Sequence, residues 1–140
     1  MVRMRWSMVG VMVCAALAMS GCDGRIPQCN RLIKVINEEQ GAIKAASGDD
    51  AAALNTFADT LESVANKVSG VELEDEQLSA FRDAYAAMAK DLAKASRDTA
   101  SALEKGEHKE AADGAKEMSG FGERESELVD SINKYCSGSA

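Results

Sequence analysis

The chain has 140 residues, with 16 basic and 23 acidic side chains and a formal net charge of −7. This length is typical of one domain. The acidic balance disfavours binding to nucleic acid through charge alone and also lying flat on an anionic lipid surface, because both need a cationic face. Beyond residue 21 there are 14 basic against 23 acidic groups, so the main part of the chain is also its acidic part.

The first 21 residues predict a cleaved leader. Arg3 and Arg5 form a short positive region, residues 7–18 are nearly all apolar, and Ser20 and Gly21 are small. This order is that of a secretory signal. The apolar run has about a dozen residues, fewer than the roughly 20 that a transmembrane helix needs, so the pattern favours cleavage over a permanent membrane span.

Cys22 follows the small residues directly, and residues 17–22, with the sequence Leu-Ala-Met-Ser-Gly-Cys, resemble a bacterial lipobox. In the lipoprotein family, the Cys thiol is diacylated, the peptide is cut just before it, and the new amino terminus is usually acylated as well. The resemblance therefore implies that Cys22 carries diacylglycerol and a further chain such as palmitate, and that residues 22–26 form a short tether. Two or three chains anchor a protein stably, whereas one anchors it marginally. An ordinary secretory signal before a soluble domain with a free Cys22 is the alternative.

Asp23 follows the expected lipidation site. By resemblance to enteric lipoproteins, an Asp here would keep the protein on the inner membrane, but that sorting rule differs between bacterial groups. The expected location is therefore the cell envelope, with the lipid in the inner or the outer membrane. The folded part would face the periplasm or the cell surface.

Cys29 and Cys136 are the two thiols that remain after Cys14 leaves with the leader and Cys22 is acylated. An even remainder in an exported chain predicts one disulfide. Closing so long a loop would restrict the unfolded chain by roughly 4 to 5 kcal/mol. A redox or metal-binding role is disfavoured, since the sequence has no Cys-x-x-Cys and no His near either thiol.

Apolar residues recur at spacings of three and four almost throughout the mature chain, which predicts an all-α fold. A first helix is expected from Pro27, a good first-turn residue, to about residue 47. Residues 48–50 then provide a stop and an N-cap for a second helix, which ends before Gly70. The apolar stripes of these two helices are Cys29, Leu32, Ile33, Ile36 and Ile43, then Leu54, Phe57, Leu61, Val64 and Val68.

A third helix is expected to open in the acidic run of residues 72–76, where negative charge favours a helix start, and to end near Gly106. A fourth helix, about residues 107–136, is less regular, and we expect Gly120 and Gly122 to kink it or to break it in two. The apolar stripe of the third helix consists of Leu78, Phe81, Tyr85, Met88, Leu92, Ala95, Thr99 and Ala102.

Four antiparallel helices joined by short turns predict an up-down-up-down bundle over residues 27–137, followed by a tail of residues 138–140. In this topology the start of the first helix lies beside the end of the fourth. Cys29 and Cys136 occupy these two places. The topology and the count of thiols therefore predict the same disulfide from independent observations.

The third and fourth predicted helices approach about 30 residues, roughly 45 Å, whereas the first two have about 20 residues. The longer pair should extend beyond the shorter pair as a hairpin of about residues 95–115, pointing away from the anchored end. Its apolar positions are mostly Ala and Thr, which bury little area, so it should be the least stable part unless something packs on it. Ala102, His108 and Ala112 mark this hairpin as the candidate contact surface. A frayed or folded-over tip is the alternative.

The sequence does not match the catalytic and metal-binding motifs considered below. His108 is the only His, and Lys105 stands three residues before it, where a di-iron bundle would need Glu. A Ser or Cys nucleophile would have His108 as its only imidazole base. The acidic run 72–76 does not fit an EF-hand loop, and no phosphate-binding Gly-Lys-Ser/Thr occurs. We therefore expect no catalytic residue, no resident metal and no cofactor.

Residues 28–37, with the sequence Gln-Cys-Asn-Arg-Leu-Ile-Lys-Val-Ile-Asn, resemble the start of small uncharacterised helical lipoproteins of myxobacteria-like genomes. That resemblance implies no activity, and two functions stay open. In the first, the bundle is an adaptor or scaffold that engages an envelope protein through its hairpin or an acidic face. In the second, it binds a small apolar ligand or a cation in space left by Ala111, Ala115, Gly120 and Gly122.

Mass spectrometry of the protein from its native envelope should find an amino-terminal Cys22 that carries the acyl groups, with residues 1–21 removed. The physical basis is the charge, length and small residues of the leader directly before that Cys. An unmodified thiol at Cys22, or an uncut leader, would contradict lipid attachment.

Overall fold

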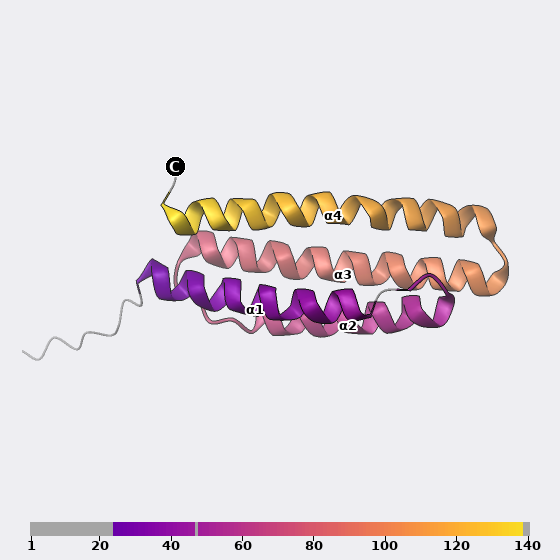
Figure 1. The fold of residues 1–140 in the computed structure, drawn as a ribbon, viewed down its shortest axis with the longest axis horizontal. Helices are drawn as coiled ribbons and strands as arrows, with labels where there is room; N and C mark the ends of the chain where they lie inside the picture. Colours follow the sequence, from indigo (N-terminus) through magenta and orange to yellow (C-terminus); the bar gives the residue numbers. More distant parts are fainter. Residues whose placement is uncertain (1–23, 47, 139–140) are drawn as a thin grey trace, which may run out of the picture.

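The chain forms a bundle of four α-helices in the computed structural model, which describes residues 24–46 and 48–138. These helices are α1 (Arg25–Ala45), α2 (Ala51–Ser69), α3 (Glu76–Lys105) and α4 (His108–Ser137). They lie side by side and run alternately up and down (Figure 1). The predicted all-α, up-down-up-down bundle is thus confirmed. The expected leader, the lipidation site Cys22 and the last two residues of the tail lie outside the described residues.

The start of α1 differs from the prediction. The helix begins at Arg25, two residues before Pro27. A proline is tolerated here because the amide groups of a first helical turn have no acceptor within the helix. Pro27 therefore loses no hydrogen bond in this turn. Arg25 and Ile26 consequently belong to the helix and not to the expected tether. No helix within the described ranges is both long and apolar enough to cross a membrane.

Aspartates cap the starts of α2 and α3, and a glycine ends α3. Asp50 and Asp75 precede α2 and α3, and each carboxylate accepts a hydrogen bond from the amide three residues later, at 2.7 and 2.9 Å. Gly106 ends α3 with a φ of 71°, a left-handed conformation that glycine adopts without strain. Only Gly106 and Glu107 separate α3 from α4, so these two helices form a tight hairpin.

α4 is one continuous helix (Figure 1), so the expected break at Gly120 and Gly122 is wrong. A Cβ atom on either glycine would meet no other atom within 4 Å. Each glycine costs the helix about 0.5–1 kcal/mol relative to alanine. Phe121 lies between them and is buried, and burial of such a side chain contributes about 1.5–3 kcal/mol. This burial is enough to offset both glycines.

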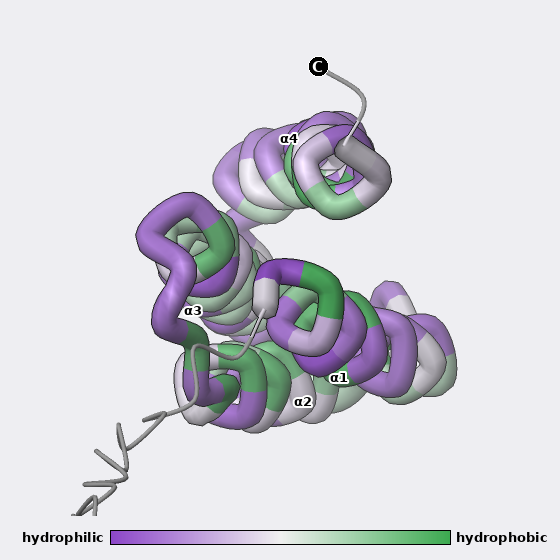
Figure 2. Tube along the Cα trace, turned by 90° about the vertical axis from the view of Figure 1, so that its left-hand side faces the viewer, coloured by the Kyte–Doolittle hydropathy of each residue, from purple (hydrophilic) through white to green (hydrophobic). Residues whose placement is uncertain are grey.

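The core is shared unequally among the helices. Eleven residues of α3 are buried but only three of α4. In the view along the bundle, α4 lies next to α3 and away from α2 (Figure 2). α4 therefore has the fewest buried residues of the four helices, although it packs along α3. The largest fully buried side chains are Tyr85, Leu32, Leu61, Leu78, Ile132, Val64 and Val68.

A disulfide joins Cys29 at the start of α1 to Cys136 at the end of α4, with the two Cα atoms 5.8 Å apart. The predicted pairing is confirmed. We call this end of the bundle the closed end. The bond links the first helix of the chain to the last one, and thus attaches the least buried helix covalently to the rest of the core.

Hydrogen bonds reinforce the closed end. The Gln28 side-chain oxygen accepts bonds from the amides of Glu74 and Asp75, at 2.7 and 2.9 Å. The Tyr135 hydroxyl donates to the Asp75 carboxylate at 2.9 Å. The amide of Leu78, together with this hydroxyl, holds the pKa of Asp75 below its usual value. These contacts connect α1, the α2–α3 connection, α3 and α4 at one place.

The opposite end, which we call the distal end, is formed by the α3–α4 hairpin. α1 has 21 residues whereas α3 and α4 have 30 each, and the hairpin extends past α1 and α2 (Figure 1). The predicted greater length of the third and fourth helices is confirmed. Several small residues of the hairpin are nonetheless buried, whereas Ala112 and Ala115 are exposed. Those buried are Ala95, Thr99, Ala100, Ala102 and Ala111.

Two contacts explain this burial. The Ser96 hydroxyl donates to the carbonyl oxygen of Leu54 at 2.8 Å, which ties the first turn of α2 to α3. Gly114 of α4 lies against Thr99 of α3 so closely that a Cβ atom on Gly114 would overlap with the Thr99 hydroxyl and lie 3.2 Å from its Cβ. The hairpin is therefore held by close approach of its two helices.

Loss of the disulfide should destabilise the bundle strongly. The cross-link closes a sequence separation of 107 residues, so the Cys29→Ser, Cys136→Ser double variant should lose roughly 4 to 5 kcal/mol of unfolding free energy. Urea unfolding of the mature protein measures this difference. Reductant should also slow the migration of the mature protein on a denaturing gel. Unchanged mobility together with two titratable thiols would contradict the cross-link.

Gly114→Ala should destabilise the protein by about 1–3 kcal/mol, because the added methyl group overlaps with Thr99 in a packed contact. Adding Thr99→Ala should recover part of the loss. The matched control is Gly120→Ala, which has open space for the methyl group and should stabilise the protein by about 0.5–1 kcal/mol. Equal effects of the two glycine substitutions in thermal or urea unfolding would refute the close contact.

Candidate functional site

Three hollows in the described part of the chain are candidate sites. The first, the connection cleft, has a volume of about 920 Å³ and lies between α1 and the segment that joins α2 to α3. The second, the core cavity, has a volume of about 210 Å³ and lies among all four helices. The third, the distal groove, has a volume of about 320 Å³ and lies between the start of α2 and the α3–α4 hairpin.

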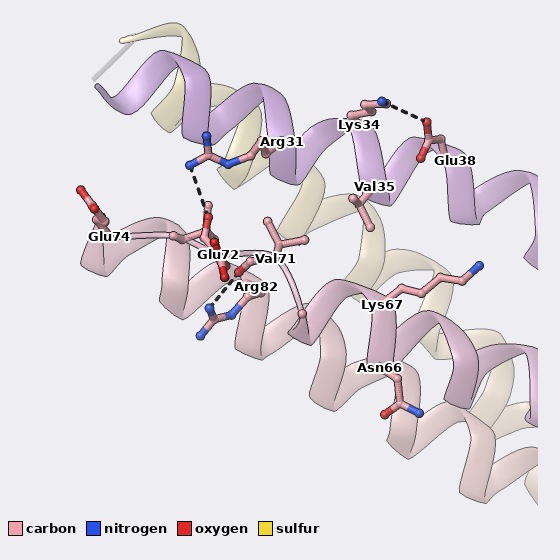
Figure 3. Close-up of a pocket in the computed structure, with 12 residues that line it drawn as sticks. Arg31, Lys34, Val35, Glu38, Asn66, Lys67, Val71, Glu72, Glu74 and Arg82 are labelled. Atoms are coloured by element: carbon pink, nitrogen blue, oxygen red, sulfur yellow. Dashed lines mark hydrogen bonds and ion pairs between the residues drawn. The ribbon is translucent and has the colours of Figure 1, made fainter. Parts of the chain in front are cut away.

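Two arginines in the connection cleft hold the chain itself. Arg31 of α1 donates to the carbonyl oxygen of Glu72 at 3.3 Å, and Arg82 of α3 donates to that of Val71 at 3.1 Å (Figure 3). Both guanidinium groups thus fasten the extended segment between α2 and α3. Their contacts assign them a structural role.

The two lysines of the cleft also have partners. Lys34 pairs with Glu38 at 3.8 Å on the exposed face of α1 (Figure 3), and Lys67 pairs with the buried Glu39 at 2.9 Å. The basic groups of the cleft are therefore matched by acceptors of the protein. No group of three or more His, Cys, Asp or Glu side chains that could hold a metal ion forms among the described residues.

The core cavity is lined mainly by apolar side chains. Its walls come from the end of α1, the middle of α2 and α3, and the middle of α4. The half-buried Ile43 and Met118 and the exposed Gly122 lie where α1 and α4 face each other. The remaining lining residues are Phe57, Leu61, Tyr85, Met88, Ala89, Leu92, Phe121 and Glu125.

One polar cluster borders this cavity. Tyr85 is 1% exposed, and its hydroxyl donates to Oε1 of Glu125 at 2.8 Å. The Gln40 amide donates to the same oxygen at 3.4 Å. Burial raises the pKa of the Tyr85 phenol well above its usual value, and the bond to the Glu125 carboxylate raises it further. Tyr85 therefore stays a neutral hydrogen-bond donor and cannot act as a base.

The distal groove exists because α1 is short. α1 ends at Ala45, whereas α4 continues to the distal end of the bundle. The groove-lining positions of α4 at this level include Ala111, Ala115 and Met118, which are small or flexible, and Leu54 of α2 lines the same groove. Gly48, Asp49, Thr99, Leu103, His108 and Ala112 complete the lining. Met118 also lines the core cavity, so the two hollows adjoin along α4.

The predicted contact residues do not form one surface. His108 and Ala112 are exposed and line the distal groove. Ala102 is only 5% exposed, because α3 packs against its neighbours at this level. A partner could not reach Ala102 in this structure without displacing a helix.

The residues expected to leave space for a ligand also do not line one common hollow. Ala111 and Ala115 line the distal groove, and Gly122 lines the core cavity. Gly120 borders neither hollow.

Sequence reasoning missed Glu125 and Gln40. Glu125 is charged and therefore does not belong to the apolar stripe of α4. Nothing in the sequence of α4 marks it as a partner for Tyr85. The available signal was Tyr85 itself, since a tyrosine on a buried helical stripe needs an acceptor for its hydroxyl. The acceptor lies 40 residues away, and it could be found only after the helices were placed.

Comparison with known proteins adds no identity. The chain matches no protein-family model, no curated protein and no solved structure. The geometry of the hollows is therefore the basis of the functional argument.

Proposed function

We propose that this chain is a lipid-anchored binding module of the bacterial cell envelope, which engages an apolar segment of an envelope protein in its distal groove and performs no catalysis. The observation that carries the proposal is the groove itself, whose lining includes exposed or half-buried apolar residues of α3 and α4. Its lining includes Leu103, Ala112, Ala115 and Met118.

The anchoring half of the proposal rests on the lipobox-like leader and on the disulfide. A structural disulfide is typical of exported proteins. α1 begins at Arg25, only three residues after Cys22, so lipid on Cys22 would hold the closed end near the membrane. The distal groove would then lie on the side away from the membrane. It would be up to roughly 45 Å from the closed end, which is the length of a helix of about 30 residues.

The expected occupant is one apolar face of an amphipathic helix with basic flanks. Helices bind in this way when their apolar face fits an apolar groove. Glu104, Glu107 and Glu110 are exposed around the turn that leads into the groove residue His108, where they outnumber the exposed Lys105 and Lys109. Acidic side chains near an apolar groove favour a partner with basic residues beside its apolar face, and long-range attraction raises the association rate.

A photo-reactive amino acid at Ala112 should crosslink the lipidated protein to a defined protein in native envelopes, because Ala112 is exposed and lines the groove. The matched control position is Ala84, which is exposed on α3 and borders none of the three hollows. Blotting and mass spectrometry of the crosslinked product identify the partner. The same products from both positions, or none from Ala112, would contradict docking at the groove.

Blocking variants extend this test. Ala115→Arg places a long cationic side chain in the groove and should abolish the crosslink from Ala112. Ala87→Arg, on the exposed side of α3, should leave it unchanged. Both positions are exposed, so both variants should fold, and circular dichroism checks this.

A further inference from the structure

We propose that the core cavity is a binding site for a small apolar amine, with the hydrocarbon part among the apolar side chains and the ammonium group on Glu125. This inference concerns a different hollow from the distal groove and does not depend on the docking function. It follows from the size of the cavity, the sign of its charge, the free hydrogen-bonding capacity of Glu125, and the position of the opening.

The size of the cavity suits a ligand of about six to eight carbon atoms. Its volume is about 210 Å³. An apolar protein cavity of about 150 Å³ is enough to take up benzene. The walls are apolar on α1, α2, α3 and α4, so water in this space would find few partners.

The charge of the lining selects the ligand class. Glu125 is the one carboxylic acid among the lining residues, and no Lys, Arg or His lines the cavity. The nearby Glu39 adds negative potential at Tyr85, which lines the cavity, although Lys67 pairs with it. A carboxylate or phosphate ligand would thus meet like charge, while Arg124 contacts the ring of the lining residue Phe121 but does not line the cavity itself. An ammonium group would meet opposite charge in a partly desolvated place, where such contacts are strongest.

Glu125 has acceptor capacity left for a ligand. Both hydrogen bonds that it accepts, from Tyr85 and Gln40, go to Oε1. A carboxylate has two oxygens and about four acceptor positions, so Oε2 can accept from a ligand while Oε1 stays bound to the protein. Tyr85 and Gln40 thereby fix the orientation of the carboxylate without saturating it.

Gly122 gives the cavity its opening. It lines the cavity, it is exposed, and a Cβ atom at this position would meet no atom within 4 Å. A side chain on residue 122 would extend into open space beside Met118 and Glu125. Its absence leaves a path from solvent to the cavity between α1 and α4.

The test measures binding of hexylamine, hexan-1-ol and hexanoate to the mature protein by calorimetry and by ligand-observed NMR. Hexylamine should bind with a Kd below roughly 1 mM, about tenfold or more tighter than hexan-1-ol, and hexanoate should bind weakest. Equal affinity for the three molecules, tighter binding of hexanoate, or no binding of hexylamine would each overturn the proposal.

Charge variants locate the ammonium group. Glu125→Gln keeps an oxygen for Tyr85 and should raise the Kd of hexylamine about tenfold, while that of hexan-1-ol changes less than about threefold. Glu123→Gln removes an exposed carboxylate from the same helix and should change neither Kd. Equal losses in both variants would show a general charge effect and would refute a site on Glu125.

Glycine variants locate the opening. Gly122→Leu and Gly120→Leu both replace an unobstructed helical glycine, so both should raise the Tm. Only Gly122→Leu should abolish binding of hexylamine and of hexan-1-ol, because only residue 122 lines the cavity. Retained binding in the folded Gly122→Leu variant would place the ligand elsewhere and would overturn the proposal.

Discussion

The covalent link between the start of α1 and the end of α4 is the constraint on which the arrangement of the bundle depends. α4 buries only three of its 30 residues, so hydrophobic burial alone gives it a weak hold on the other helices. Cys29 and Cys136 attach it at the closed end, and the bond from Tyr135 to Asp75 adds a polar contact to the start of α3. With this end fixed, α4 can keep the small residues Ala111, Gly114 and Ala115 near the distal end without losing its place.

A difference in helix length produces the distal groove. α1 has 21 residues and α4 has 30, so the ends of the two helices can lie level at one end of the bundle only. The disulfide sets this at the closed end. At the distal end the inner face of α4 therefore has no first-helix neighbour. The close approach of Gly114 to Thr99 holds α4 against α3 at this level, so the missing neighbour leaves a lined groove and not a collapsed tip.

Helical period, chain polarity and thiol count were enough to predict the four helices, their order and the disulfide, because these features depend on local spacing and on topology. Two sequence-based expectations failed for a shared reason. Gly120 and Gly122 were expected to kink or break the fourth helix, but the helix is continuous, and burial of Phe121 between them is enough to keep it. Ala102 was named as part of the contact surface, but it is covered because a neighbouring helix comes close. Both outcomes depend on what lies across the helix interface, which spacing within one helix does not encode. The Tyr85–Glu125 bond was missed for the same reason.

The attachment of α4 at its two ends has a mechanical consequence. A tight turn fastens one end to α3 and a covalent bond fastens the other to α1. The middle of α4 is also held, because Phe121 is buried and Glu125 accepts a bond from Tyr85. Cutting the sulfur–sulfur bond would release the carboxyl-terminal end, so fraying of α4 would begin at that tip and would be stopped by the contacts near its middle.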